Sequence, residues 1–247
     1  MNLIICMAGY NTRFHDVGFD IPKYLLPWGK RTVIEEILYR LTEFNCFKNI
    51  LLVANERDLY FKSKLLKSLK NLNLSNKNLF YIGDTYGQGH TAALSLEFFL
   101  KSHNENEPIF FHNADTILTK RKLDLVVKNF DKYEGYVDVF FGKSPKFSYV
   151  KVKNNVITQI EEKKIISSLA SSGLYAFNKI TTYLERYNNF LNLKANKEIF
   201  ISDIIKFSIK NKGKFAVNKL LKNQETIVLG SPEEYGLEVT RRFTKLD

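Results

Sequence analysis

The first half of the chain alternates between short apolar runs and longer amphipathic stretches. The apolar runs have the length of buried strands and lie at residues 3–7, 49–54, 79–82 and 109–112. The amphipathic stretches have helical spacing and lie at residues 32–44, 57–69 and 89–100. Helices commonly connect parallel strands, because a parallel crossover needs about a dozen residues or more. The pattern therefore predicts an α/β fold with three layers around a mainly parallel central sheet.

The second half is richer in β segments. Strands are expected at residues 136–142, 148–153, 156–161, 173–177, 215–220 and 226–229, with a hairpin turn at Asn154-Asn155. Helices are expected at residues 180–190 and 199–210, and Ser231, Pro232 and Glu234 mark the start of a last helix. No Pro/Gly/Ser-rich linker and no repeat separates the halves. We therefore expect one domain over residues 1–247, whose second half forms a lobe on the same sheet.

Composition excludes several classes of protein. The chain is 45% hydrophobic, has no apolar run of membrane-spanning length and shows no secretory signal, which predicts a cytoplasmic protein without a membrane partner. The net charge of +11 comes from scattered lysines, without an aromatic RNA-binding motif or a zinc finger, so no nucleic-acid partner is expected. Two cysteines without a Cys/His cluster also argue against structural zinc. No feature indicates an oligomeric state.

A glycine-bearing loop directly follows the first apolar run. It reads Met7-Ala8-Gly9-Tyr10-Asn11-Thr12-Arg13, and Pro22-Lys23 comes shortly after it. Backbone N–H groups can approach a ligand closely where there is no side chain, and two cations can spread over phosphate oxygens. This combination of groups is typical of a triphosphate site.

Five later segments complete a pattern with this loop. They are Gly87-Gln88-Gly89-His90-Thr91-Ala92-Ala93-Leu94, Phe111-His112-Asn113-Ala114-Asp115, Ile160-Glu161-Glu162-Lys163, Ser171-Ser172-Gly173-Leu174-Tyr175 and Leu229-Gly230-Ser231-Pro232-Glu233-Glu234. In this order they resemble the motifs of the sugar nucleotidyltransferase family. The resemblance implies a Rossmann-like, three-layer nucleotidyltransferase fold. It further implies a nucleotide-binding half at residues 1–118 and a smaller β-rich acceptor-binding half at 119–247.

The same resemblance implies a role for each matched residue. The nucleotide-binding residues are Met7, Ala8, Gly9, Tyr10, Asn11, Arg13, Lys23, Gln88, Gly89 and Thr91. Arg13 and Lys23 are also the catalytic residues, because they stabilise charge on the phosphates. Asp115 would hold Mg²⁺ or another divalent cation, and the acceptor-binding residues are Glu162, Lys163 and Gly173. Taken alone, Asp115 also fits a turn aspartate, and Glu162-Lys163 also fits an exposed pair of charges.

Two positions depart from the family pattern. Asn11 replaces the second loop glycine, and asparagine tolerates the left-handed backbone conformation. Val228 stands where the family often has a second metal-binding aspartate, which leaves Asp203, Glu198 or water to complete the metal shell. His112 lies on an apolar strand and is interpreted as a core histidine.

Within the family the chain looks most like small bacterial cytidylyltransferases of capsule and surface-polysaccharide pathways. That implies transfer of CMP from CTP to a small phosphorylated acceptor, with phosphoglutamine favoured and pyrophosphate released. Phosphocholine and sugar 1-phosphates are alternative acceptors. Two other classes stay open: a glycosyltransferase, although Asp115-Thr116-Ile117 lacks the second acid of a DxD motif, and a nucleotide-binding regulatory protein without turnover, which Val228 suggests.

Overall fold

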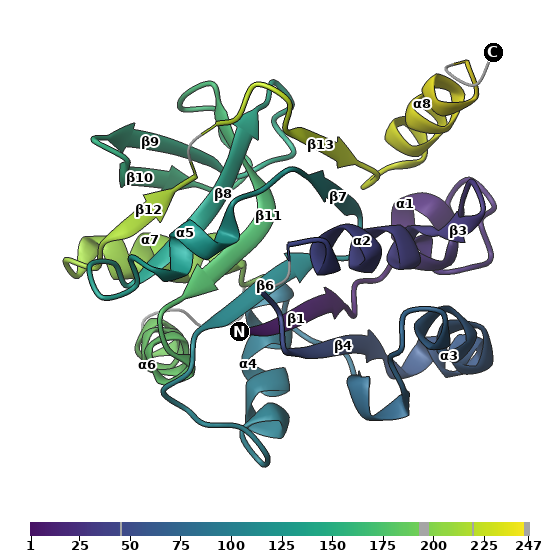
Figure 1. Cartoon of the computed structure of the whole chain (residues 1–247), viewed down its shortest axis with the longest axis horizontal. Helices are drawn as coiled ribbons and strands as arrows, with labels where there is room; N and C mark the ends of the chain where they lie inside the picture. The colour runs from purple at the N-terminus through teal and green to yellow at the C-terminus, as the bar shows by residue number, and fades with distance from the viewer. Residues whose placement is uncertain (45, 193–197, 219, 245–247) are drawn as a thin grey trace.

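A nine-stranded sheet runs through the centre of the molecule (Figure 1). The structure is a computed structural model that describes residues 1–44, 46–192, 198–218 and 220–244. From one edge to the other the strands are β5 (Leu79–Ile82), β4 (Asn49–Asn55), β1 (Asn2–Met7), β6 (Ile109–Asn113), β11 (Leu169–Phe177), β8 (Gly135–Phe141), β12 (Phe215–Val217), β10 (Val156–Glu161) and β9 (Tyr149–Lys153). Strands from both halves of the sequence thus lie in one sheet.

The sheet is mixed, and its parallel part is formed by strands from the first half of the sequence. Strands β5, β4, β1 and β6 are parallel neighbours, with β1 between β4 and β6. Strand β11 then pairs antiparallel with both β6 and β8, and β12 continues parallel to β8. The hairpin of β9 and β10 closes the far edge. Because β1 and β6 are parallel, their carboxyl ends lie at the same end of the sheet. Ligands usually bind beyond the carboxyl ends of the strands in such folds.

Helices cover both faces of the sheet, as the layered pattern predicts (Figure 1). Helices α2 (Val33–Thr42) and α3 (Lys62–Lys70) pack with one apolar cluster, which includes Leu3 and Ile5 of β1. Helices α4 (Gln88–Phe99), α6 (Ile180–Leu191) and α7 (Ile201–Lys210) pack with a second cluster, which includes Ile4. Successive strand residues point to opposite faces, so this alternation separates the two cores. The prediction of a three-layer α/β fold is confirmed.

Several local predictions are confirmed and others need correction. Thr32 and Glu35 form the predicted capping box at α2, and Asn154 and Asn155 both have positive φ in their hairpin turn. The helix predicted over 57–69 instead begins as the 3-10 helix η2 (Glu56–Phe61), because the Asn55 side chain caps a tight first turn. The strand predicted over 215–220 is wrong in length, and residue 219 lies outside the described residues. Strand β12 stops at Val217 because the Asn218 side chain, not its backbone, bonds the backbone of β8.

A short two-stranded ribbon lies beside the main sheet, and only one of its strands, the one expected at residues 226–229, was predicted from the sequence. Strand β7 (Thr116–Thr119) pairs antiparallel with β13 (Glu225–Val228) as a separate sheet beside the main one. Helix α8 (Pro232–Phe243) follows β13 and lies to one side of the body in Figure 1. The small elements α1 (Thr12–His15), β2 (Pro27–Trp28), β3 (Arg31–Thr32), η1 (Lys23–Leu25) and α5 (Leu123–Val127) were also not predicted.

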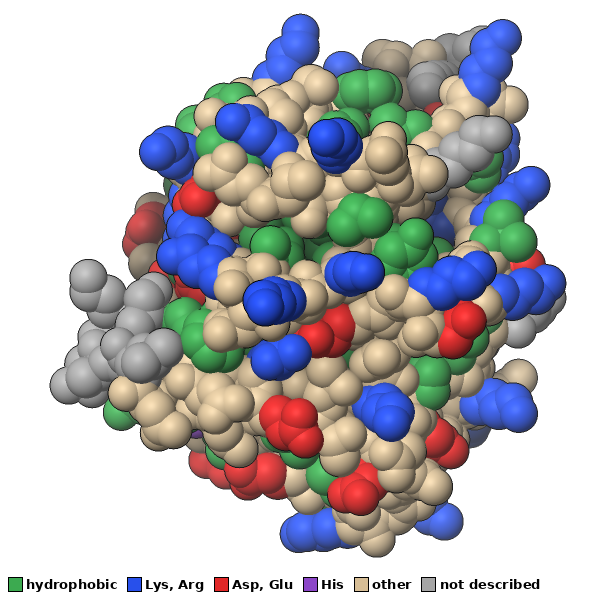
Figure 2. Space-filling model, turned by 90° about the vertical axis from the view of Figure 1, so that its left-hand side faces the viewer, with side chains coloured by type: hydrophobic (Ala, Val, Ile, Leu, Met, Phe, Trp, Pro, Cys, Tyr) green, Lys and Arg blue, Asp and Glu red, His purple; other side chains and the backbone are tan. Residues whose placement is uncertain are grey.

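The charged side chains are dispersed on the face drawn in Figure 2. Lys and Arg side chains are spread over this face, and Asp and Glu lie between many of them. Among the described residues, no helix combines the length and apolarity needed to cross a bilayer.

Candidate active site

A cavity of about 700 Å³ opens where β1 and β6 end. Of the residues singled out in the sequence, Met7, Ala8, Gly9, Tyr10, Asn11, Arg13, Lys23, Gln88, Thr91, Asp115, Glu162, Lys163 and Gly173 line it. They come from positions up to 166 apart, counted from Met7 to Gly173. Gly89 is not in the lining. Its N–H donates to the Ile199 carbonyl oxygen at 2.8 Å, so it packs α4 closely against the segment that precedes α7.

The glycine-bearing loop leaves β1 and turns into the short helix α1. Asn11 caps this helix in the left-handed conformation, with φ 56° and ψ 19°. This is the backbone that asparagine tolerates better than most residues, so the departure from glycine is accommodated. Phe14 is buried beneath the loop, and Arg13 beside it is exposed at the cavity. The loop therefore presents a cation on a helix turn that is anchored in the core.

Lys23 and Asp115 form an ion pair in the cavity. The Lys23 Nζ lies 2.5 Å from Asp115 Oδ2, and the two side chains are 24% and 17% exposed. Burial alone would raise the pKa of Asp115, but the Lys23 ammonium and the Thr116 hydroxyl that donates to it hold that pKa below its ordinary value. The carboxylate is therefore charged at neutral pH and available to a cation.

The β7–β13 ribbon determines where Asp115 lies. The Leu229 N–H donates to the Asp115 carbonyl oxygen at 2.7 Å, and Val228 pairs with Thr116 in the ribbon. Val228 thus lies next to the Asp115 backbone, lines the cavity and brings an apolar side chain there. A site for a cation at Asp115 consequently receives no oxygen from the side chain at 228.

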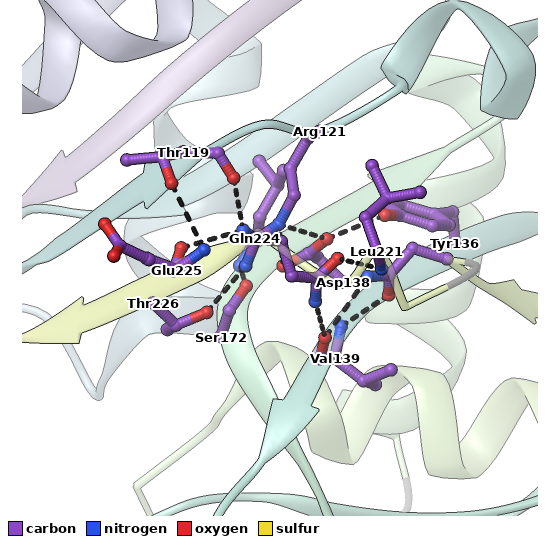
Figure 3. Close-up of polar contacts among 12 residues, drawn as sticks. Thr119, Arg121, Tyr136, Asp138, Val139, Ser172, Leu221, Gln224, Glu225 and Thr226 are labelled. Carbon is purple, nitrogen blue, oxygen red and sulfur yellow. Dashed lines mark hydrogen bonds and ion pairs between the residues drawn. The ribbon is translucent and has the colours of Figure 1, made fainter.

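A buried arginine joins this ribbon to the main sheet (Figure 3). Arg121 donates from Nε to both oxygens of Asp138 on β8, each at 3.1 Å. Its remaining nitrogens bond the backbone oxygens of Thr119 and Glu225 and the hydroxyl of Thr226. Both side chains of the ion pair are at most 1% exposed. The guanidinium therefore fixes β7 and β13 relative to β8.

Two glycines keep the region around Gln88 open. Gln88 Nε2 donates to Asn113 Oδ1 at 2.5 Å, at the carboxyl end of β6. Gly173 has φ 85°, and a Cβ there would overlap the Asn113 side chain. Gly87 has φ 101°, and a Cβ there would lie 2.7 Å from the Ile199 carbonyl oxygen. Both positions thus require glycine for conformation and for space.

Charges of both signs surround the part of the cavity predicted to bind the acceptor. Glu162 accepts hydrogen bonds from Ser148 and, at 2.6 Å, from Ser202 on α7. The Lys163 ammonium lies 3.6 Å from the Glu198 carboxylate and 4.3 Å from the centre of the Phe200 ring. Glu198 is therefore paired on this side of the cavity. Asp203 does not line the cavity, and its carboxylate accepts from the Phe200 N–H to cap α7.

The chemistry of the donors fits a magnesium-like cation bound together with phosphates. Among the residues that the structure describes, no group of three or more His, Cys, Asp or Glu side chains could hold a metal. Mg²⁺ is commonly bound by only one or two carboxylates, with substrate phosphates and water as its other ligands. The Asp115 carboxylate, facing a cavity lined by Arg13 and Lys23, suits such a shared shell.

Several lining residues were not foreseen as site residues. They include Asn113, Lys146, Ser148, Phe200 and Glu234. Glu234 belongs to the Leu229–Glu234 segment and marks a helix start, but neither pattern predicted a place for its side chain in the site. Ser148, which donates to Glu162, lies 14 positions before that glutamate. Spacing in the sequence carries no signal for partners of this kind, because the fold alone brings them together.

Comparison with known proteins identifies the class. The model of the nucleotidyl transferase family matches residues 2–223, and the chain therefore belongs to this family. Enzymes of the family generally use a divalent metal such as Mg²⁺.

Individual relatives agree with this assignment. The chain is 26% identical over 217 residues to the bifunctional protein GlmU of Methanococcus maripaludis, covering 85% of this chain and 47% of that protein. It thus spans about half the length of this curated relative. The nucleoside-diphosphate-sugar pyrophosphorylase from Vibrio cholerae RC9 is similar with a TM-score of 0.82 and 25% identity, over 98% of this chain and 100% of that one. The inositol-1-phosphate CTP transferase from T. maritima shares the fold, with a TM-score of 0.74 and 17% identity over 97% and 94% of the chains.

Proposed function

We propose that this protein is a divalent-metal-dependent nucleotidyltransferase. It transfers a nucleoside monophosphate from an NTP to a small phosphorylated acceptor and releases pyrophosphate. The observation that carries the proposal is the Lys23–Asp115 pair, which faces the same cavity as the glycine-bearing loop and Glu162. Two mutually repelling polyanions need positive groups for alignment, and the Lys23 ammonium, the backbone N–H groups of the loop and a divalent cation held by the carboxylate would supply them.

The reaction needs no side-chain nucleophile. An anionic oxygen of the acceptor phosphate forms a bond to the α-phosphorus, and the bond from that phosphorus to pyrophosphate breaks. Arg13 and the backbone of the Gly9 loop hold the triphosphate, and Lys23 stabilises charge on the α-phosphate. A divalent cation held at Asp115 would supply Lewis-acid polarisation of the phosphate oxygens. The chain itself contributes orientation, and its cavity surrounds the two substrates.

Phosphoglutamine is the acceptor that we favour, with CTP as nucleotide, in capsule or surface-polysaccharide synthesis. The support from the cavity is its mixed charge: Lys146 and Lys163 suit a carboxylate, and Glu162 and Glu198 suit an ammonium group. Phosphoglutamine carries both groups. Phosphocholine has no carboxylate, and sugar 1-phosphates present neutral hydroxyls instead. CTP is favoured because the motifs of the sequence resemble those of small bacterial cytidylyltransferases.

A screen for released pyrophosphate tests the proposal. Four NTPs are combined with phosphoglutamine, phosphocholine and glucose 1-phosphate in the presence of Mg²⁺. Release is expected to be fastest with CTP and phosphoglutamine, and to fall by about 100-fold or more in kcat in Lys23→Ala. Lys64→Ala, on the exposed side of α3, is the matched control with unchanged rate.

Other outcomes of the screen have definite meanings. Fast release with a sugar 1-phosphate or phosphocholine would overturn the favoured acceptor and retain the reaction. Tight nucleotide binding without release from any pair would instead support the regulatory alternative that Val228 suggests. Sugar transfer from a nucleotide sugar, without pyrophosphate, would support a glycosyltransferase.

A further inference from the structure

We propose that the Glu234 carboxylate is the second protein ligand of the divalent cation, together with Asp115. This inference rests on the proposed function, since it concerns the metal of that same reaction. It also explains how the chain can bind a metal although Val228 brings no oxygen to the cavity. The second acid then comes from the first turn of α8.

The carboxylates of Asp115 and Glu234 both lie next to Gly230. A Cβ placed on Gly230 would lie 3.4 Å from Asp115 Oδ2 and also 3.4 Å from Glu234 Oε2. Two carboxylate oxygens therefore flank one small space, and all three residues line the cavity. The missing side chain at 230 leaves this space open. A pair of anionic oxygens about a shared opening is the donor set that a hard divalent cation prefers.

The start of α8 holds Glu234 in this position. Its N–H donates to the Ser231 hydroxyl at 3.4 Å, which fixes the first turn of the helix. The Tyr235 hydroxyl donates to the Pro27 carbonyl oxygen at 2.6 Å, and its ring packs edge-on against Phe14. Helix α8 is thus attached to the segment that carries the phosphate loop, so Glu234 has a defined place beside that loop.

The Glu234 carboxylate does not cap its own helix, although a glutamate three residues after the N-cap often does so. At the start of α2, Glu35 returns its carboxylate to the Thr32 N–H in a reciprocal capping box. At α8 the corresponding bond to the Ser231 N–H is not formed. Among the residues that the structure describes, the Glu234 carboxylate has no hydrogen-bond or ion-pair partner. It therefore remains available to a ligand in the cavity.

The Lys23 ammonium supports a cation at this point. It lies 2.5 Å from Asp115 Oδ2, the same oxygen that faces Glu234 across Gly230. A positive charge is thus already favoured here. Asp115 and Glu234 would hold the dication of a metal–nucleotide complex, and the Lys23 ammonium would then be free to contact the phosphates.

Manganese binding tests the inference without relying on turnover. Mn²⁺ is titrated into the full-length protein with a non-hydrolysable CTP analogue, and free Mn²⁺ is followed by electron paramagnetic resonance. Glu234→Gln is expected to weaken Mn²⁺ binding by at least about tenfold, as is Asp115→Asn. Glu233→Gln, one residue earlier and 86% exposed, is the matched control and should stay within about twofold. Unfolding curves of all variants verify that each is folded.

The outcomes separate this inference from the proposed function. If Glu234→Gln binds Mn²⁺ as the unaltered protein does while Asp115→Asn does not, Glu234 is not a ligand and the proposed reaction stands. If Asp115→Asn also binds normally, or no Mn²⁺ binds at all, both the two-carboxylate site and the metal-dependent reaction are overturned. Glu234→Gln should not weaken binding of the metal-free nucleotide analogue, because it removes a negative charge beside the phosphates. This distinguishes a metal ligand from a residue that merely shapes the loop.

Discussion

Removing the charge of Asp138 should destabilise the protein more than most single substitutions. Asp138→Asn keeps the size of the side chain but leaves the Arg121 guanidinium without a counter-charge. Asp138 is fully buried, and the Arg121 side chain is 1% exposed, so water cannot replace the lost carboxylate. Breaking a buried ion pair from one side costs about 3–5 kcal/mol of unfolding free energy. The Tyr136 hydroxyl also donates to Asp138, at 2.9 Å, and asparagine offers a single oxygen to accept this bond together with that from Arg121.

Urea unfolding and thermal melts measure this loss. For a chain of this size, each kcal/mol lowers Tm by roughly 2–4 °C, so Tm should fall by roughly 6–20 °C. Glu238→Gln removes one acid from the Arg241–Glu238 pair, in which the Arg241 side chain is 72% exposed, and should cost less than about 1 kcal/mol. A loss for Asp138→Asn no larger than for this control would refute the reasoning, because it would mean that the buried guanidinium needs no charged partner.

Three further predictions concern the cavity and its supporting strands. Lys23→Met should raise the pKa of Asp115 above that of the unaltered protein, since burial then acts without the ammonium; carboxyl carbon NMR titration measures it, and an unchanged pKa would contradict the assignment. Gly173→Ala should lower the free energy of unfolding in urea by about 1–3 kcal/mol, because φ is 85° and a Cβ would overlap the Asn113 side chain. It should also weaken nucleotide binding, because Asn113 accepts the hydrogen bond from Gln88. Gly236→Ala, where a helical Cβ meets nothing within 4 Å, should instead be neutral or stabilising, and equal effects at the two glycines would oppose the argument. Burial lowers the pKa of His112, so the unfolded chain binds a proton that the folded protein does not. Stability should therefore decrease as pH falls below 6.5, the ordinary value, and His112→Gln should remove that part of the pH dependence of the urea midpoint; the same slope in both proteins would show that another group is responsible.

Periodicity in the sequence was sufficient for most elements of the sheet. Residues 79–82 and 156–161 were predicted as strands with the bounds that β5 and β10 have. Strand β13 was predicted at residues 226–229, but its partner β7 was missed, because β7 has only four residues and follows β6 after two. Strand β12 ended early because an asparagine side chain replaced the backbone ladder, which no periodicity records.

The candidate site was predictable only where a motif carried it. The Gly9 loop and Asp115 follow strands and match a family pattern, and both line the cavity. The partners that set their chemistry are distant in sequence: Lys23 and Asp115 are 92 positions apart, and Ser202 is 40 positions from Glu162. Glu234 carried a signal for a helix start, which is a sufficient reason for a glutamate there and conceals any second role. Such contacts follow from sheet order and not from spacing.

The interior place of β1 affects how ligand binding and unfolding are linked. Strand β1 carries the phosphate loop at its end and pairs on both sides, with β4 and β6, while Glu234 reaches the same cavity from the far part of the sequence. The residues that line the cavity come from several elements that are far apart in the sequence. The complete cavity therefore exists only while the central sheet is intact. A nucleotide present at 100 times its Kd would add about 2.7 kcal/mol to global stability. Hydrogen exchange of amides deep in β1 and β6 should slow along with that of the loop, because both depend on the same cooperative opening.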